Sequence, residues 1–331
     1  MNALVLSGGG ALGAFEAGAI KALYDSGSKF DLICGTSIGA INASFAAQDK
    51  ISELTSLWLG IADMQPPLIG YVDQVRYAID LLDEIEKVER GNIFGLEPAI
   101  VRWAQIGSKK ALVRITGFVK PDVISQILTA NLDFGRLTRS LIVTATNLTF
   151  ASSDAFYAFV GPNSEAAQQS FLKGYSNNAH PISRDNFELA VRSSAAIPGA
   201  FEPVSMNLGT QGNKEYVDGG VANNTPTRLA AQAGATEIVV MLLEPQQVST
   251  ALYPTANLLE IAATSLTVMQ QRLLQLDMEL VNTDPNVKID VIRPSVALTL
   301  GVLEFNNKTA IDDAFHQGEA AVKDMRSLEK R

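Results

Sequence analysis

The sequence predicts an α/β fold with a mostly parallel central sheet and helices on both faces. Short apolar runs alternate with longer segments of helical spacing through most of the 331 residues, which is the pattern of a parallel sheet. The first two apolar runs each end in a glycine-containing turn that leads into a helix. With 47% hydrophobic residues, the chain is long enough to form one large domain over residues 1–331.

The first element is predicted to be a buried strand at residues 1–6, followed by a glycine run and a helix at residues 11–24. Gly8, Gly9 and Gly10 at the start of that helix expose backbone N–H groups at the positive end of the helix dipole. Such groups bind anions. In acyl transfer they could form an oxyanion hole, which stabilises the charge that develops on a carbonyl oxygen.

The same glycines also fit a dinucleotide-binding loop. Gly8, Gly10 and Gly13 satisfy the G-x-G-x-x-G pattern, and Asp31 follows about twenty residues later. In such folds the ribose-binding acid comes after the second strand, whereas Asp31 comes before the second apolar run. We therefore expect no dinucleotide at this loop.

The second apolar run, residues 32–34, leads into Gly35-Thr36-Ser37-Ile38-Gly39 and a predicted helix at residues 40–48. A G-x-S-x-G sequence between a strand and a helix is typical of a nucleophile elbow, in which a strained turn lifts the serine off the sheet edge. Gly35 and Gly39 would leave the space that this turn needs. Alternatively, Ser37 is only the N-cap of an ordinary helix.

After the elbow, residues 51–138 are predicted to be mainly helical. Helical spacing indicates helices at residues 51–62, 71–89, 96–105 and 123–132, and only residues 111–119 resemble a strand. This stretch forms a helical insertion that could act as a lid over the site. The alternative is that its apolar stripes belong to the core.

The rest of the chain returns to alternation. We expect strands at residues 140–146, 155–160, 237–243 and 287–292, helices at residues 187–194, 227–233, 258–280 and 309–328, and a polar loop at residues 161–184. Asp218, Gly219 and Gly220 follow a short apolar run. An acid beside two glycines leaves room for a substrate or another backbone, although a D-G hairpin turn has the same sequence.

The composition argues against several classes of function. A net charge of −9 and a pI ≈ 4.9 disfavour nucleic-acid binding through a basic surface and docking on anionic lipid by charge alone. Cys34 is the only cysteine, so it forms no internal disulfide, and no zinc or iron–sulfur ligand pattern is present. There is no secretory signal and no apolar run of transmembrane length. We expect a cytoplasmic protein that needs no metal or cofactor.

Together these stretches resemble the patatin-like phospholipase family. The resemblance rests on Gly8-Gly9-Gly10 with Gly13, on the elbow from Gly35 to Gly39, and on Asp218-Gly219-Gly220 with Asn223, Asn224 and Pro226. Weaker matches lie at residues 146–148, 194–203 and 317–318, whereas residues 51–138 contribute little. One difference is Leu12, where many relatives carry Arg or Lys. It removes a positive charge near the site and puts a preference for anionic head groups in doubt.

The resemblance implies a lipid acyl hydrolase of the phospholipase A or lysophospholipase type with a Ser-Asp dyad. Ser37 would attack an ester carbonyl and form an acyl-enzyme, and Asp218 would accept the serine proton. The N–H groups of Gly8, Gly9 and Gly10 would hold the oxyanion. The substrate would be a lipid ester, reached through peripheral contact with a membrane. The sequence makes no prediction of the oligomeric state.

Two alternatives to the dyad enzyme remain. A Ser-His-Asp esterase could use His316, because Ser37, Asp218 and His316 follow the triad order of α/β-hydrolases. However, His316 lies in a predicted helix among acidic residues, and His180 lies in the predicted polar loop. A catalytically silent lipid-binding or regulatory module is the second alternative, although all three motifs are intact.

Overall fold

The computed structural model describes residues 1–64, 117–119, 122–245 and 258–329. The strands are β1 (Asn2–Leu6), β2 (Leu32–Thr36), β3 (Gly117–Val119), β4 (Ser140–Asn147), β5 (Ser152–Ala158), β6 (Ala179–Pro181), β7 (Gly199–Phe201), β8 (Val204–Asn207), β9 (Asn213–Asp218), β10 (Glu237–Met241) and β11 (Lys288–Ile292). The α-helices are α1 (Gly13–Asp25), α2 (Ile38–Ala47), α3 (Ile51–Gly60), α6 (Asp122–Asn131), α7 (Ser164–Tyr175), α8 (Phe187–Ser194), α9 (Thr227–Gln232), α10 (Leu258–Asn282) and α11 (Lys308–Glu329).

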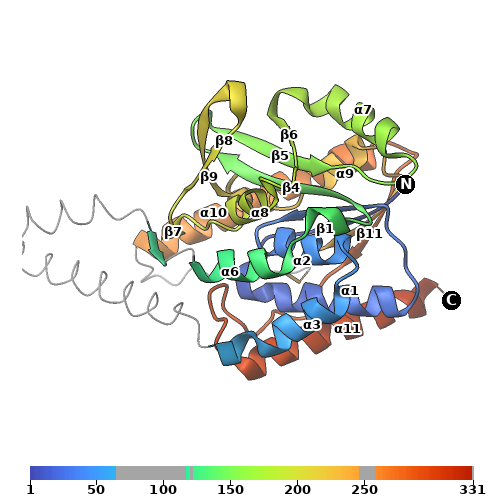
Figure 1. Cartoon of the computed structure of the whole chain (residues 1–331). Coiled ribbons are helices and arrows are strands. Elements are labelled where there is room, and N and C mark those ends of the chain that lie inside the picture. Colours follow the sequence, from blue (N-terminus) through green and yellow to red (C-terminus); the bar gives the residue numbers. More distant parts are fainter. Residues whose placement is uncertain (65–116, 120–121, 246–257, 330–331) are drawn as a thin grey trace, which may run out of the picture.

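A central sheet organises these elements (Figure 1). Its strand order is β11-β10-β1-β2-β4-β5-β6, with β9 paired to β4 and β8 paired to β9, while β3 and β7 form a separate pair. The five strands from β11 to β4 are parallel, and β5 and β9 run antiparallel to β4. The mostly parallel α/β fold predicted from the sequence is therefore confirmed.

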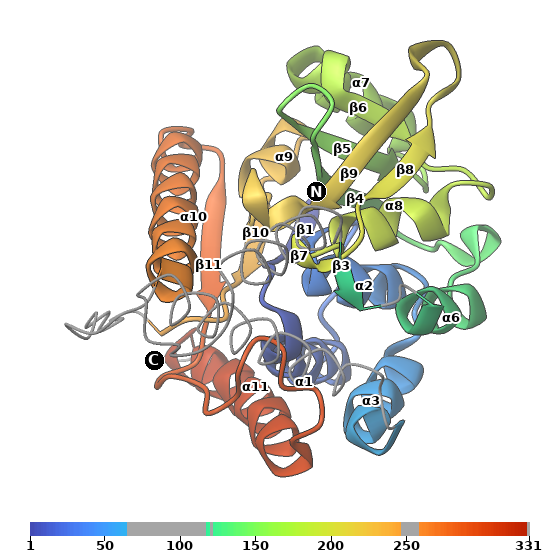
Figure 2. The same ribbon diagram turned by 90° about the vertical axis from the view of Figure 1, so that its left-hand side faces the viewer.

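Helices cover both faces of the sheet, and successive strand residues alternate between the two cores. Leu4 and Leu6 of β1 pack in a cluster with α1, α2, α3, α6, α8 and α11, whereas Ala3 and Val5 pack in a cluster with α7, α9 and α10. Figures 1 and 2 show this division, with α1, α3 and α11 together on one side of the sheet. Burial on both faces explains why β1 and β2 are mostly apolar, with Asn2 and Thr36 only at their ends.

The carboxyl ends of β1, β2, β10 and β11 lie at one edge of the sheet. Leu6 is level with Gly35 of β2 and with Met241 of β10, and Met241 is level with Ile292 of β11. The segments that follow these four strands therefore meet at this edge, where parallel sheets bind their ligands.

The polar loop predicted for residues 161–184 is wrong, because this segment contains α7 and β6. Ala167 and Phe171, four residues apart, are the buried residues of α7. A helix that buries only one narrow face has few apolar residues, so its composition resembles that of a loop. The helix predicted from residue 11 also differs, since a 3₁₀ turn, Gly10–Leu12, precedes α1.

Of the predicted insertion at residues 51–138, the structure describes α3, β3, α6 and two 3₁₀ turns, Ile61–Met64 and Phe134–Arg136. Leu54, Trp58 and Leu128 on α3 and α6 are buried in the main core. The predicted helices at residues 71–89 and 96–105 lie outside the described residues.

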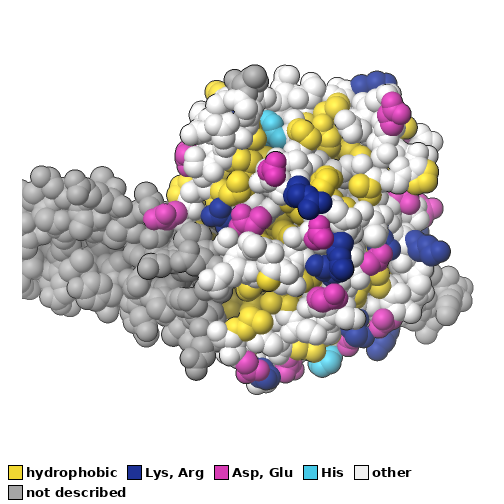
Figure 3. Space-filling view, viewed as in Figure 1, with side chains coloured by type: hydrophobic (Ala, Val, Ile, Leu, Met, Phe, Trp, Pro, Cys, Tyr) yellow, Lys and Arg dark blue, Asp and Glu magenta, His cyan; other side chains and the backbone are white. Residues whose placement is uncertain are grey.

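The face of the molecule seen in Figure 3 carries a mixture of charges. Acidic and basic side chains are interspersed over the face seen in Figure 3, with no extended basic area there. Among the described residues, no helix is long and apolar enough to cross a membrane. The same residues contain no group of His, Cys, Asp and Glu side chains that could hold a metal ion.

Candidate active site

Ser37 occupies a strained turn between β2 and α2. Its φ of 56° and ψ of −125° lie in a region that residues with a side chain rarely adopt, and such a conformation costs on the order of 1–3 kcal/mol. Ser37 stands at the N-cap position of α2, but its hydroxyl makes no capping hydrogen bond. Instead, its backbone N–H donates to Ser194 Oγ at 2.8 Å. The interpretation of Ser37 as a simple helix cap is therefore wrong.

The turn is possible because two backbones come unusually close at Gly39. A Cβ atom there would lie 2.6 Å from the Ser7 carbonyl oxygen and 2.7 Å from that of Leu6, at the end of β1. At Gly35 a Cβ atom would lie 2.3 Å from the Gly39 carbonyl oxygen. Neither position can hold a larger residue unless the backbone moves.

The Ser37 hydroxyl donates to Asp218 Oδ2 at 2.5 Å, although the two residues are 181 positions apart. Both side chains are almost fully buried. Asp218 ends β9 and begins a 3₁₀ turn, Gly219–Val221, whose Gly220 N–H donates to Asp218 Oδ1 at 2.7 Å. The D-G hairpin interpretation is also wrong, because Asp218 stands at the far end of the β8–β9 hairpin from its turn.

The pairing of the strands explains how these residues meet. Thr36 of β2 is level with Thr144 of β4, and Asp218 of β9 is level with Ala145, the next residue of β4. The other edge of β4 is occupied by β5. Strand β9 therefore takes up the edge of β4 where β2 ends, which puts Asp218 beside the turn that carries Ser37.

The backbone around Asp218 is held firmly. Its N–H donates to the Ala196 carbonyl at 2.8 Å, and its carbonyl accepts from Thr146 Oγ1 at 2.8 Å. A Cβ atom on Gly219 would lie 2.3 Å from the Thr144 carbonyl oxygen, so the strand end packs directly on β4. These contacts fix the carboxylate with little freedom to move away from Ser37.

Burial raises the pKa of Asp218 to about 6, although the hydrogen bonds from Ser37 and Gly220 lower it in part. A carboxyl group with this pKa is still mostly ionised at neutral pH, and it is a stronger base than an exposed aspartate. It can therefore accept the proton of the neighbouring hydroxyl without a histidine between them.

The glycine loop lies against Ser37, but its N–H groups are not all free. A Cβ atom on Gly8 would lie 3.0 Å from Ser37 Cβ, and the Gly8 N–H donates to the Asn224 carbonyl at 3.1 Å. Gly8 is thus a poor oxyanion donor, which corrects the expectation for that residue. No hydrogen bond among the described residues engages the N–H groups of Gly9 and Gly10. Gly10 has a φ of 58°, which a glycine adopts readily. Gly13 begins α1 behind the loop.

Ser37 borders two cavities. The larger, about 710 Å³, is lined by the glycine loop, Ser37, Asp218 and residues after β10 and β11. The smaller, about 80 Å³, has an almost wholly apolar wall contributed by α2, α3, α6 and neighbouring segments. The apolar residues of this wall include Ile41, Leu57, Trp58, Ile61, Ile124, Ile127, Leu128, Ile197, Phe201 and Phe305. Both ends of the predicted insertion therefore contribute to the surroundings of Ser37.

The residues that a dinucleotide site or a triad with His316 would require lie away from Ser37 and Asp218. Asp31 accepts from the Asn2 N–H at 2.9 Å, at the amino end of β1 and thus at the edge of the sheet opposite the glycine loop. The side chain of His316 is 69% exposed on α11 and contacts Glu319 of the same helix. Neither a dinucleotide site nor a triad with His316 is assembled.

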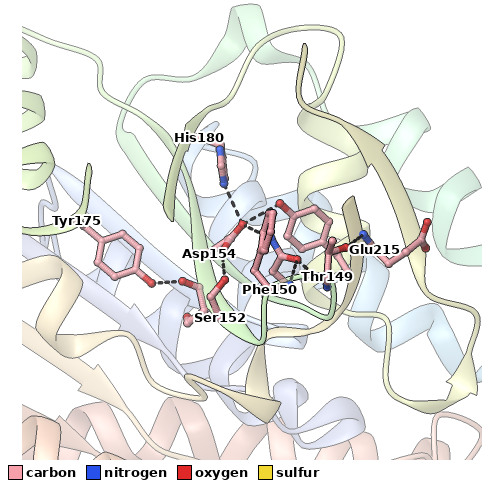
Figure 4. Close-up of polar contacts among 10 residues, drawn as sticks. Thr149, Phe150, Ser152, Asp154, Tyr175, His180 and Glu215 are labelled. Carbon is pink, nitrogen blue, oxygen red and sulfur yellow. Dashed lines mark hydrogen bonds and ion pairs between the residues drawn. The ribbon is translucent and has the colours of Figure 1, made fainter. Parts of the chain in front are cut away.

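His180 is buried rather than placed in a polar loop, and it belongs to a hydrogen-bond network around Asp154 (Figure 4). Asp154 Oδ2 lies 2.9 Å from His180 Nε2 and accepts from Asn147 Nδ2 at 2.9 Å and from the Tyr216 hydroxyl at 2.8 Å. Asp154 Oδ1 accepts from Ser152 Oγ at 2.8 Å. The network links β4, β5, β6 and β9, and Tyr216 is two residues before Asp218.

Burial alone would raise the pKa of Asp154, but hydrogen bonds from His180, Asn147, Ser152 and Tyr216 outweigh it and lower the pKa below its ordinary value. Sequence analysis missed this network, because its members are spread over four elements. It also missed Ser194, although the small residues that begin at that position formed part of the resemblance.

Comparison with known proteins gives a consistent result. Residues 4–231 match the family model described as patatin-like phospholipase. The uncharacterized protein YqhO of Bacillus subtilis is 29% identical over 248 residues, which cover 73% of this chain and 71% of YqhO. Lysophospholipase nte1 of Aspergillus terreus is 38% identical over 80 residues, which cover 20% of this chain but only 5% of that protein.

Two solved structures show weaker similarity. VipD from Legionella pneumophila has 16% sequence identity and a TM-score of 0.37, and the match covers 96% of this chain and 67% of VipD. The ExoU–SpcU complex of Pseudomonas aeruginosa contains a chain with 16% identity and a TM-score of 0.30, with coverage of 98% of this chain and 52% of that one.

The Asp154 network generates a prediction about stability. Asp154→Ala should leave the buried donors of Asn147, Tyr216 and His180 without an acceptor, and we expect it to lower the free energy of unfolding by roughly 3–5 kcal/mol. Urea denaturation at pH 7 measures this loss. Because the pKa of Asp154 is lowered on folding, its contribution is present above its unfolded pKa of ~4 and is lost as the pH falls through its folded pKa.

The matched control is Asp25→Ala. Asp25 forms an exposed pair with Lys21 on α1, and its removal should cost less than about 1 kcal/mol. Equal losses for the two variants would contradict a structural role for the network.

Proposed function

The chain belongs to the patatin-like phospholipase family, and on that basis we propose that it is a lipid acyl hydrolase that cleaves carboxylic esters through a Ser-Asp dyad. One observation carries the proposal: the hydroxyl of Ser37, on a strained turn, donates to the buried Asp218 at 2.5 Å beside a glycine loop. Ester hydrolysis by a serine enzyme needs three parts, namely a nucleophile, a base and hydrogen-bond donors for the oxyanion.

The proposed reaction has two halves. In the first, Ser37 Oγ attacks the ester carbonyl carbon while Asp218 Oδ2 accepts the hydroxyl proton, and the carbonyl oxygen becomes an oxyanion held by the N–H groups of Gly9 and Gly10. Collapse of this intermediate expels the alcohol, which takes the proton from Asp218, and leaves an acyl-enzyme. In the second half, water loses a proton to Asp218 and attacks the acyl carbonyl. Release of the fatty acid returns the proton to Ser37.

The two cavities support a lipid as the substrate. The small apolar cavity beside Ser37 suits the first carbons of an acyl chain, and we propose that the ends of the insertion at residues 51–138 bind this chain. The larger, partly polar cavity suits the alcohol half of the ester. A silent binding module would have no need for a strained serine bonded to a buried base, because that conformation costs stability.

Helix α10 lies at the outside of the structure (Figure 2), and its exposed side chains support peripheral contact with a membrane. Met269, Leu273, Leu276 and Leu280 are each between 39% and 59% exposed, and their spacing puts them along one stripe of the helix. Gln270, Gln271 and Leu274 of the same helix line the larger cavity. We therefore propose that this α10 stripe rests on a lipid surface and brings the cavity to its substrate.

The proposed nucleophile is tested by Ser37→Ala. We expect the rate of ester hydrolysis to fall roughly a thousandfold or more, because the attacking atom is lost. Labelling by a fluorophosphonate probe should disappear as well, while circular dichroism should be unchanged. The control is His316→Ala, which should keep most of the activity because His316 is exposed and pairs with Glu319 of its own helix. Activity retained in Ser37→Ala would contradict Ser37 as the nucleophile, whereas activity lost in both variants would favour a triad with His316.

The pH dependence tests the proposed base. Only ionised Asp218 can accept a proton, so kcat/KM should rise through an ionisation near pH 6 and level off above pH 7. We expect roughly a tenfold fall from pH 7 to pH 5, because one pH unit below the pKa leaves about a tenth of the group ionised. Asp218→Asn should abolish this activity. A profile that stays flat down to pH 4 would argue against Asp218 as the base.

The membrane contact is tested by the double variant Met269→Gln, Leu273→Gln. These residues project from an exposed face, so the fold should survive while co-sedimentation with neutral phosphatidylcholine vesicles falls several-fold. Leu148→Gln is the control, because Leu148 is also 52% exposed but lies in the β4–β5 turn. Unchanged vesicle binding together with loss of a dimer in analytical ultracentrifugation would show that the α10 stripe contacts a second copy instead.

A further inference from the structure

Arg293 is a cation at the catalytic edge of the sheet that the proposed mechanism does not use. It directly follows β11 and lines the larger cavity together with Ser37 and Asp218. We propose that Arg293 binds a phosphate group on the alcohol half of the substrate and so makes the enzyme selective for phosphate-bearing lipid esters. This inference rests on the proposed function, since it names the substrate class of the same site.

The first support is that the guanidinium of Arg293 has no anionic partner among the described residues. The residue is half-buried, and burial lowers its pKa. No hydrogen bond or ion pair among the described residues engages its guanidinium. A guanidinium remains charged in proteins, so removing part of its water without a partner costs stability. A bound anion would restore the missing interactions.

The second support is the charge distribution in the cavity. Among the described residues that line the cavity, Arg293 is the only basic one, and Asp218 and Glu244 are the acidic ones. The carboxylate of Asp218 accepts hydrogen bonds from Ser37 and Gly220. The carboxylate of Glu244 accepts one from Gln271 Nε2 at 2.5 Å, so both acids have other partners than Arg293. The glycine loop contributes no cation, since Leu12 is its lining side chain after Gly10. Any anionic group in this cavity would therefore be drawn toward Arg293.

The third support is the position of Arg293 relative to Ser37. Strands β11 and β2 are three strand spacings apart in the order β11-β10-β1-β2, which corresponds to roughly 14 Å between their backbones. Both residues line the same cavity, so one ligand in that cavity can reach both of them. In a glycerophospholipid the phosphate and the ester carbonyls are joined through one short glycerol unit. The planar guanidinium can donate two parallel hydrogen bonds to such a phosphate.

The experiment compares two esters that differ only by the phosphate: a short-chain 1-acylglycerol 3-phosphate and the 1-acylglycerol with the same acyl chain, both below their micellar concentrations. The readout is the ratio of kcat/KM for the phosphate ester to kcat/KM for the neutral ester. Arg293→Gln should lower this ratio by about tenfold to a hundredfold, as expected for one lost charge-assisted interaction, and mainly through KM. Arg293→Lys should lower this ratio less, because lysine keeps the positive charge and loses only the pair of parallel hydrogen bonds.

The matched control is Arg228→Gln. Arg228 lines the neighbouring cavity, which shares Asn224, Thr225 and Leu274 with the larger one. It therefore tests whether any nearby cation would have the same effect, and we expect the ratio to stay within about twofold of the wild-type value. An unchanged ratio in Arg293→Gln, or an equal fall in Arg228→Gln, would overturn the proposal. Circular dichroism confirms that each variant is folded.

A binding measurement separates this inference from the proposed function. Calorimetry on Ser37→Ala, which cannot form an acyl-enzyme, should detect binding of glycerol 3-phosphate that is lost when Arg293→Gln is added. Inorganic phosphate should bind more weakly than glycerol 3-phosphate; equal binding of the two would overturn the assignment to a lipid head group. If the wild type hydrolyses neither ester, the proposed function fails, and Arg293-dependent binding of glycerol 3-phosphate still decides the role of Arg293.

Discussion

The close approach of α2 to the end of β1 is the constraint on which the rest of the site depends. It exists because Gly39 has no side chain to collide with the carbonyl oxygens of Leu6 and Ser7. Only with that approach can the chain turn sharply enough after β2 to hold Ser37 at a positive φ. A strained residue persists when its surroundings leave it no alternative. Here the hydrogen bonds from the Ser37 N–H to Ser194 and from its hydroxyl to Asp218 hold the turn from two further directions.

Two buried aspartates show how differently this fold treats the same side chain. Asp154 is held by four side-chain partners, and its pKa is lowered. Asp218 receives only two hydrogen bonds, from Ser37 and Gly220, and burial raises its pKa to about 6. A fully satisfied carboxylate contributes stability, whereas an incompletely satisfied one keeps an affinity for protons. The difference is consistent with a structural role for Asp154 and a chemical role for Asp218.

Much of the fold could be predicted from the sequence, because the evidence was local. The period of apolar residues identified β1, β2, α1 and α11, and the glycines marked the turns at which Ser37 and Asp218 lie. The features that escaped prediction depend on long-range packing. Helix α7 buries one narrow face and resembles a loop, and His180 is buried only because β6 pairs with β5. Likewise, the Gly8 N–H is engaged by the Asn224 carbonyl, a contact across 216 positions that the spacing of the glycines cannot reveal.

The arrangement of β9 explains how Ser37 and Asp218 meet directly, without a histidine between them. In the sheet, β5 pairs with one edge of β4 from Leu141 to Asn147, and the other edge is shared by β2 and then β9. Strand β9 runs antiparallel to β4, so it ends where β2 also ends, and its last residue faces the turn directly. The pairing of β9 with β4 thus places the proposed base, Asp218, at hydrogen-bond distance from the proposed nucleophile, Ser37. A histidine relay spans a gap between an acid and a serine, and this topology leaves no such gap.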